Sequence, residues 1–255
     1  MPATRPRPTD QADVRRFNSV LVLDQVASAG PLSRAQVSSA TGLTRATVGS
    51  IVDELIGAGL VLEQGTRSTG VGRPGTDLAL RPSGGAGIGL EINVDGLTAV
   101  AVDLTGEVRW RRTRPGDQRG RPVPAVLRSA AALVDAALAE AETQGLRVVG
   151  VGVAVPGLVD LGAQLVRTAP NLGWTDVAVV ERLRAAAGRR WPDFVRLDNE
   201  ANLAALGELW SGEHGVTETF VLVNGDVGVG AGVVLDGQLH RGSRGFGGEL
   251  GHLTV

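Results

Sequence analysis

A long apolar stripe near the N-terminus constrains the fold of this chain more than any other feature. Its members are Val48, Ile51, Val52, Leu55, Ile56 and Leu60. Because this spacing follows the turns of an α-helix, one face of the helix must be buried against neighbouring elements. Thr44 precedes the stripe, and its side chain is suited to cap the first turn. The stripe therefore predicts a packed helix that starts at Thr44.

Two further helices are expected before this one. Apolar residues at mostly helical spacing predict a helix over residues 13–29, which Gly30 and Pro31 stop. These residues are Val14, Phe17, Val20, Leu21 and Val26. Ser33 and Gln36 have the spacing of a capping box, so a short helix begins at Ser33 and ends near Gly42. Two short helices joined by a glycine-containing turn indicate a helix-turn-helix motif.

The exposed start of the third helix is the candidate DNA-contacting surface. The candidate residues are Thr44, Arg45, Thr47 and Ser50. Small or hydrogen-bonding side chains allow a helix end to approach base edges and phosphates closely. The alternative interpretation is an ordinary solvated helix face.

A stretch rich in glycine and arginine follows the third helix. Residues 60–63 and 77–80 read as two short strands, and the tip between them carries Arg73 between Gly72 and Pro74. An extended arginine suits an A·T-rich minor groove, although a mobile loop with an incidental arginine is the alternative. Helix-turn-helix followed by hairpin predicts a winged helix-turn-helix domain over residues 13–82, after a flexible N-terminus over residues 1–12.

Composition excludes several classes of protein. A length of 255 residues favours two domains. The absence of cysteine excludes a disulfide framework, cysteine-ligated zinc and thiol nucleophiles. No apolar run has the length of a membrane span and no signal peptide is present, so we expect a cytoplasmic protein without a membrane partner. Residues 1–82 hold nine arginines against seven acids, and residues 83–255 hold 16 against 20, a mild asymmetry that suits a DNA-binding front part.

The pattern changes to α/β after the breaker-rich residues 81–85. Residues 87–94 and 98–104 read as strands joined at Asp95 and Gly96, and residues 107–111 can add a third. A helix over residues 124–144 and an apolar strand over 148–154 follow. This order predicts a mixed sheet covered by helices.

The motifs together resemble the ROK family, whose name joins repressors, open reading frames and sugar kinases. The similarity runs from about residue 13 through the end of the chain, and the block Gly247-Gly248-Glu249-Leu250-Gly251-His252 is its most specific part. The chain looks like a xylose-repressor-like regulator. The resemblance implies an actin-like (ribonuclease-H-like) sugar-kinase-type domain over residues 86–255, with an incomplete second lobe.

The resemblance also implies a sugar site. Its candidate residues are Asn171, Asn199, Glu200, Glu249 and His252. In family kinases an aspartate at the position of Glu200 takes the proton of a sugar hydroxyl. The extra methylene of glutamate displaces the carboxylate, and a misplacement near 1 Å can cost about 100-fold in rate. We therefore expect sugar binding without a catalytic residue. Trp174 could stack on a sugar, but a core anchor is the more common role.

The phosphate-contacting blocks depart from the family pattern. Gly228, Gly230 and Gly232 form the remnant of one block, in which Asp226 replaces the first glycine. The other block lacks its paired glycines and has Val94 and Asp95 instead, which add bulk and negative charge where phosphate would bind. These changes are unfavourable for the ATP grip that the resemblance implies.

The resemblance places the zinc-binding cysteines of the family after Val255. His252 would be a zinc ligand only in a longer protein, so no cofactor is expected in this chain. A chain ending here is expected to leave an open sheet edge or an uncovered apolar face, and to form a homodimer.

Three functional hypotheses follow. The leading one is a sugar-responsive repressor of carbohydrate-metabolism genes, whose partners are a double-stranded operator and a small sugar such as xylose, glucose or an N-acetylated amino sugar. The alternatives are an ATP-dependent sugar kinase with a fused DNA-binding domain, and a truncated DNA-binding remnant without an effector response.

Overall fold

The computed structural model describes residues 10–67, 75–211, 219–225, 227–242, 247–248 and 250. The chain divides into two compact units, and the boundary lies between Gly85 and Ala86. Each unit has its own hydrophobic core. The predicted wing residue Arg73 and the predicted sugar-site residues Glu249 and His252 lie outside the described residues.

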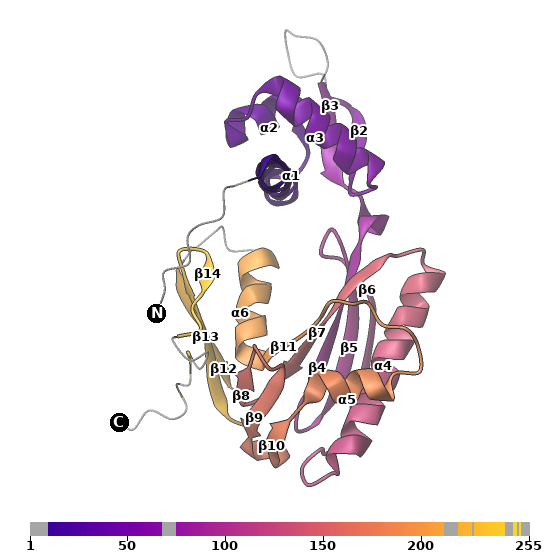
Figure 1. Cartoon of the computed structure of the whole chain (residues 1–255), viewed down its shortest axis with the longest axis vertical. Coiled ribbons are helices and arrows are strands. Elements are labelled where there is room, and N and C mark those ends of the chain that lie inside the picture. The colour runs from indigo at the N-terminus through magenta and orange to yellow at the C-terminus, as the bar shows by residue number, and fades with distance from the viewer. Residues whose placement is uncertain are drawn as a thin grey trace. The chain divides into compact units, whose positions relative to one another are not determined.

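The first unit contains three helices and a small antiparallel sheet (Figure 1). The helices are α1 (Gln11–Ser28), α2 (Arg34–Thr41) and α3 (Arg45–Gly57). The strands are β1 (Leu32–Ser33), β2 (Val61–Arg67) and β3 (Gly75–Leu80), arranged in the order β1-β3-β2. A single turn of 3-10 helix, Pro82–Gly84, follows β3.

Local capping explains where α2 and α3 begin and end. The Ser33 side chain accepts the Gln36 amide and the Gln36 side chain accepts the Ser33 amide, which confirms the predicted capping box. Gly42 ends α2 in the left-handed region at φ 71°, where a side chain would be strained. The Thr44 hydroxyl accepts the Thr47 amide at 3.2 Å and caps α3.

The apolar stripe of α3 forms the centre of the first core, as predicted. Val48, Ile51, Val52 and Leu55 are buried. They pack with Val22 and Val26 of α1, Val37 of α2, Val61 of β2 and Leu78 of β3.

Most of the apolar residues that predicted α1 lie outside the core. Val14, Phe17 and Val20 are exposed, and Phe17 is 68% accessible. The face of α1 that meets α3 follows Arg15, Ser19, Val22 and Val26, which are four, three and four residues apart. Arg15 makes an ion pair with Glu54 of α3, so the inward face is polar in its first half. The helix is therefore confirmed, but the packing face does not follow the apolar residues.

The second unit is built on a five-stranded mixed sheet. Its strands are β4 (Ala86–Ile92), β5 (Gly96–Asp103), β6 (Val108–Pro115), β7 (Val148–Val155) and β11 (Val195–Asn199). They lie in the order β11-β7-β4-β5-β6. β4, β5 and β6 are antiparallel neighbours, whereas β7 and β11 run parallel to β4. The predicted hairpin, third strand and apolar strand are thereby confirmed.

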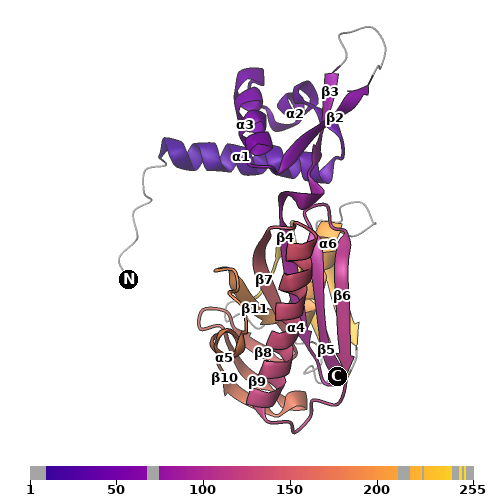
Figure 2. The same ribbon diagram turned by 90° about the vertical axis from the view of Figure 1, so that its right-hand side faces the viewer.

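Helices cover one face of this sheet. α4 (Val123–Thr143) packs on β4, β5 and β6, and α5 (Val179–Ala186) packs against α4 (Figure 2). Inward residues of β4, Ile88, Leu90 and Ile92, meet Val126, Leu127 and Ala130 of α4 in the main core. Alternate burial along β4 and β5 follows from the period of two in a strand.

Two smaller sheets complete the second unit. One contains β8 (Leu158–Asp160), β9 (Leu165–Ala169) and β10 (Trp174–Val177), and a 3-10 turn, Pro170–Leu172, joins β9 to β10. The other contains β12 (Phe220–Gly225), β13 (Val229–Leu235) and β14 (Gln238–Leu239). Helix α6 (Glu200–Ser211) packs against β12 and β13.

Candidate functional site

A cavity of about 270 Å³ lies in the second unit at the carboxyl ends of its parallel strands. Asn93 follows β4, Pro156 and Gly157 follow β7, and Asn199 ends β11. Ligands in open α/β sheets bind outside the carboxyl ends of the strands, so this is the expected position of a binding site. The remaining lining residues are Val94, Ala169, Pro170, Asn171, Glu200, Val227, Gly228, Val229, Gly230, Ala231 and Gly248.

The structure brings several of the predicted residues together at this cavity. Asn171, Asn199 and Glu200 line it, although they come from the turn after β9, the end of β11 and the start of α6. Gly228 and Gly230 of the glycine-rich block also line it, whereas Gly232 does not. The cavity therefore collects amide and carboxylate side chains, which can accept and donate hydrogen bonds to hydroxyl groups.

The side chain of Asn199 makes three hydrogen bonds to other described residues. Its Oδ1 accepts the amides of Ala201 at 2.8 Å and Asn202 at 3.3 Å, and so caps α6. Its Nδ2 donates to the carbonyl of Gly157 at 2.9 Å. Asn199 therefore joins the start of α6 to the turn after β7, and both elements border the cavity.

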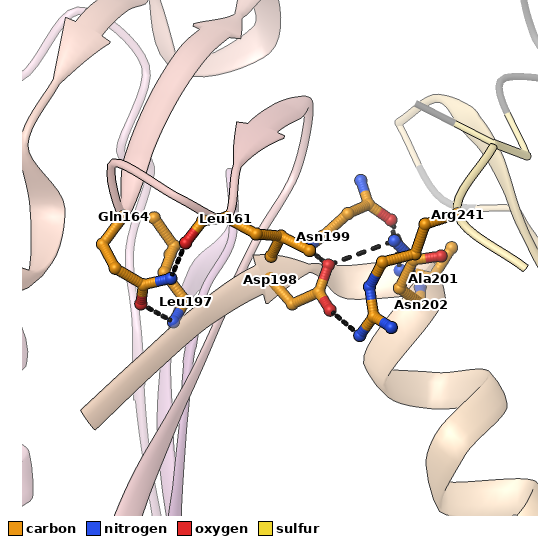
Figure 3. Close-up of polar contacts among 8 residues, drawn as sticks. All are labelled: Leu161, Gln164, Leu197, Asp198, Asn199, Ala201, Asn202 and Arg241. Atoms are coloured by element: carbon orange, nitrogen blue, oxygen red, sulfur yellow. Dashed lines mark hydrogen bonds and ion pairs between the residues drawn. The ribbon is translucent and has the colours of Figure 1, made fainter. Parts of the chain in front are cut away.

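Asp198 is a buried carboxylate beside the cavity residues (Figure 3). Its Oδ2 lies 2.6 Å from Nη2 of Arg241, in an ion pair whose side chains are 8% and 34% exposed. Its Oδ1 accepts the Asn199 amide at 2.8 Å and Nδ2 of Asn202 at 3.1 Å. The sequence carries no signal for the pairing of Asp198 with Arg241, which lies 43 residues away.

Arg241 connects this carboxylate to a backbone segment at the cavity. The Arg241 carbonyl accepts the amide of Gly247 at 2.7 Å, and the carbonyl of Gly248 accepts the amide of Ala231 at 2.9 Å. Gly248 has φ 93°, and a side chain there would clash with the Ala231 carbonyl. Glycine is thus required where this segment approaches β13.

Gln164 fixes the opposite side of β11 (Figure 3). Its Oε1 accepts the Leu197 amide at 2.8 Å and its Nε2 donates to the Leu161 carbonyl at 2.6 Å. These bonds attach the β8–β9 turn to the strand that ends in Asp198 and Asn199.

The alternating glycines have two different roles. A side chain at Gly228 would meet Nδ2 of Asn171 at 3.6 Å, so this glycine lies beside a cavity side chain. A side chain at Gly230 would lie 3.3 Å from Cβ of Ala201, and one at Gly232 would lie 2.5 Å from the Ala201 carbonyl. Gly230 and Gly232 therefore allow β13 to pack closely on α6, which is a structural reason for glycine that the sequence pattern alone does not provide.

Pro156 and Gly157 are cavity residues that the motifs did not identify. Gly157 has φ 98°, and a side chain there would clash with the Thr168 carbonyl. A Pro-Gly pair directly after an apolar strand is a turn signal at the carboxyl end of a strand, and it could have indicated this part of the site. Trp174 is 1% exposed and packs in the main core, so it is a core anchor.

The predicted DNA-contacting residues lie at the start of α3 in the first unit. Thr44 and Arg45 are exposed. The hydroxyls of Thr44 and Thr47 lie 2.9 Å apart within the cap. Ser50 is also exposed, but its hydroxyl accepts Nη2 of Arg15 at 2.8 Å. Arg45 is thus the cationic side chain that this helix end presents to solvent.

Arg34 stabilises the arrangement of the elements around α3. It forms ion pairs with Asp53 of α3 and with Glu63 of β2. Partial burial opposes the charged form, but the hydrogen bonds that Arg34 donates to Glu63 and Asp53, together with the negative charges of these two groups, outweigh it and raise the pKa of Arg34 above its ordinary value. α2, α3 and β2 are joined through this one side chain.

Within the described residues, no three His, Asp or Glu side chains are grouped so that they could hold a metal ion. None of the helices that the structure describes is long and apolar enough to cross a membrane.

The second unit is an α/β fold with a polar cavity at the carboxyl ends of its parallel strands. Comparisons with known proteins identify its family. The model of the ROK family matches residues 87–255. The chain belongs to the ROK family. It is 32% identical to the xylose repressor of Caldicellulosiruptor bescii over 245 residues. This alignment covers 95% of this chain and 59% of that protein.

Two solved structures extend the comparison. A ROK family transcriptional regulator, a homologue of the Escherichia coli MLC protein, superposes with a TM-score of 0.74 at 26% identity, over 95% of this chain and 60% of the other. A ROK hexokinase from Thermus thermophilus superposes with a TM-score of 0.54 at 31% identity, over 67% of this chain and 53% of the other. The chain thus spans about three fifths of the length of the regulators that it matches.

Proposed function

We propose that the chain is the DNA-binding and effector-binding part of a sugar-responsive transcriptional repressor of carbohydrate-metabolism genes. The observation that carries the proposal is the span of the similarity. The matches to a xylose repressor and to a ROK transcriptional regulator cover 95% of the chain, which includes both units. The match to the hexokinase covers 67%.

We propose that the first unit is a winged helix-turn-helix domain. α2 and α3 are joined by a glycine-containing turn, and the β2–β3 hairpin follows them. In this arrangement the second helix of the motif enters the major groove with its N-terminal residues. Arg45 and the cap residue Thr44 are at that position, and we assign Arg73 to the wing that reaches the minor groove.

We propose that the cavity of the second unit binds a monosaccharide. Its volume of about 270 Å³ is below the range of roughly 300–1,000 Å³ typical of pockets for drug-sized ligands. Asn171 and Glu200 supply groups for sugar hydroxyls. Glu249 and His252 are proposed as further contacts.

Two features favour a regulator over a sugar kinase. Val94, which stands with Asp95 where the resemblance implies paired glycines, lines the cavity and is buried. Phosphoryl transfer depends almost entirely on positioning and electrostatic stabilisation, and both suffer when the phosphate loop and the base are altered. Glu200 at the base position fits a group that holds a hydroxyl.

The first experiment is a DNA-binding measurement at fixed salt. A duplex is selected from a random pool by the purified chain, and its affinity is then titrated with xylose, glucose and N-acetylglucosamine. Release of DNA by one sugar is the expected result. A homodimer on a pseudo-palindromic site would select half-sites about 10 bp apart, or a multiple of this distance.

Arg45→Gln tests the DNA-contacting helix in the same assay. Loss of one base contact should cost about 1–3 kcal/mol of binding free energy. Arg16→Gln removes an exposed arginine from α1 and is the matched control. Equal affinities of the two variants would contradict the assignment of Arg45. DNA binding that no sugar changes would support the remnant without effector response instead.

A further inference from the structure

A second cavity, of about 340 Å³, lies in the second unit between helices α4 and α5. We refer to it as the α4–α5 cavity, and Figure 2 shows the two helices side by side. Its lining residues are Pro124, Leu127 and Arg128 of α4, and Arg182, Ala185 and Ala186 of α5. None of them lines the cavity at the strand ends. The proposed sugar site therefore gives the α4–α5 cavity no role.

The two helices contribute the same pattern to this cavity. On each helix the second and third lining residues follow the first at three and four positions, so the three residues share one face of the helix. Each of these faces carries one arginine, and its other members are apolar. The α4–α5 cavity is thus bounded by apolar side chains and by two guanidinium groups, one from each helix.

Short side chains on α5 leave this space open. Ala185 and Ala186 each present only a methyl group where the two helices meet. Leu127 is 1% exposed and belongs to the main core, so it forms the floor of the cavity. Packed helices normally fill the space between them with side chains. Because an apolar cavity of about 150 Å³ is large enough for a benzene molecule, the α4–α5 cavity has room for a ring and a polar group.

The two arginines of the cavity have no partner among the described residues. Arg128 and Arg182 are exposed, and neither guanidinium makes an ion pair or a hydrogen bond with the part of the chain that the structure describes. Two nearby arginines outside the cavity differ in this respect. Arg184 donates to two backbone carbonyls, and Arg189 pairs with Glu142. The positive charges at the cavity are therefore available to an anion, which would also reduce the repulsion between them.

We propose that the α4–α5 cavity binds a small amphiphilic anion, namely a carboxylate or phosphate monoester joined to an aromatic or short aliphatic group. The planar guanidinium group matches the oxygens of both anions. The apolar part of the ligand contacts Leu127 and the two alanines, as apolar linings do in small-molecule sites. The competing explanation is that the arginines only solvate an exposed helix surface.

The first experiment measures ligand binding to the purified chain by fluorine NMR at fixed salt. The probes are 4-fluorophenyl phosphate and 4-fluorobenzoate, one for each anion. We expect at least one probe to bind with a Kd of about 1 mM or lower, in keeping with its size. If neither probe binds, the inference is wrong.

Two matched ligands separate charge from apolar contact. 4-Fluorophenol keeps the ring without the anion, and inorganic phosphate, added as a competitor, keeps the anion without the ring. Each should bind about tenfold more weakly than the amphiphilic probe, because it lacks one of the two kinds of contact. Equal binding of either control would overturn the inference, since the site would then recognise only one part of the ligand.

A double variant tests where the probe binds. Arg128→Gln with Arg182→Gln should weaken binding about tenfold or more, because both charge-assisted hydrogen bonds are lost. The control, Arg111→Gln with Arg190→Gln, removes the same charge from exposed positions of the second unit that do not line the cavity. Thermal unfolding verifies that both variants are folded. Equal affinities of the two variants would show that the probe binds elsewhere.

Ala185→Leu tests the space itself and keeps both arginines. The larger side chain reduces the volume between the helices, so the probe should bind more weakly. This variant also carries the test if the double arginine variant does not fold. Unchanged affinity of the Ala185→Leu variant would contradict the inference.

Titration with sugars separates this inference from the proposed function. Xylose, glucose and N-acetylglucosamine should not displace the fluorinated probe, because the two cavities share no lining residue. Displacement by a sugar would place the probe in the sugar cavity and overturn the inference. Conversely, a chain whose DNA binding no sugar changes would contradict the proposed effector response and leave binding at the α4–α5 cavity unaffected.

Discussion

At the scale of single residues, glycine positions decide how closely elements can approach the cavity. Gly157 and Gly248 have positive φ angles and lie against carbonyl groups of other strands. Gly232 has no special backbone angle, yet a side chain there would overlap the backbone of α6. Gly157 and Gly248 are needed because any other residue type would be strained at their positive φ angles. Gly232 is needed only because its backbone lies against α6.

Gly232→Ala tests the close packing of β13 on α6. The added methyl group would lie 2.5 Å from the Ala201 carbonyl, so the helix must move away from the strand. Overpacking of this kind should lower the free energy of unfolding by about 1–3 kcal/mol. Urea unfolding followed by circular dichroism measures it. Gly152→Ala, on β7, is the control because nothing lies within 4 Å of its added atom; equal stability of the two variants would disprove the packing argument.

At the scale of elements, the Asp198–Arg241 ion pair joins segments that are distant in sequence. Asp198 lies at the end of β11, and Arg241 follows β14. The same carboxylate accepts the Asn202 side chain of α6. The pair therefore fixes the position of the segment that contributes Gly248 to the cavity relative to the start of α6.

A double-mutant cycle tests this connection. Arg241→Gln leaves the buried Asp198 carboxylate without its cation, which should cost about 1–3 kcal/mol of stability. Asp198→Asn in addition removes the buried charge, so the double variant should be more stable than the sum of the single changes predicts. A coupling of about 0.5–3 kcal/mol is expected from residues in direct contact. Additive changes in urea unfolding would indicate that the pair contributes nothing.

At the scale of the whole molecule, the proposed function requires that two binding events are linked. A sugar can release DNA only if it binds the two functional states with different affinity. Linkage then demands that DNA lowers sugar affinity by the same factor by which sugar lowers DNA affinity.

This reciprocity is a quantitative prediction. We expect a factor of about 5–150, which corresponds to a coupling of roughly 1–3 kcal/mol. Calorimetric titration of the effective sugar, with and without a saturating selected duplex, gives one factor, and anisotropy gives the other. Unequal factors would mean that sugar and DNA do not act through one equilibrium of the same chain.

The sequence by itself determined the features that depend on neighbours within about four residues. The capping box of Ser33 and Gln36, the Thr44 cap and the buried stripe of α3 all match the predictions. Strand alternation likewise identified the β4–β5 hairpin. Such features are readable because the partners are set by the period of a helix or strand.

Only the tertiary structure decided which surfaces meet. The inward face of α1 was not readable, because Arg15 reaches Glu54 across 39 positions and leaves Phe17 exposed. The bond of Asn199 to Gly157 and the pairing of Asp198 with Arg241 also join residues more than 40 positions apart. Local patterns fix the elements, but contacts between distant residues depend on how those elements pack, and packing involves the whole unit at once.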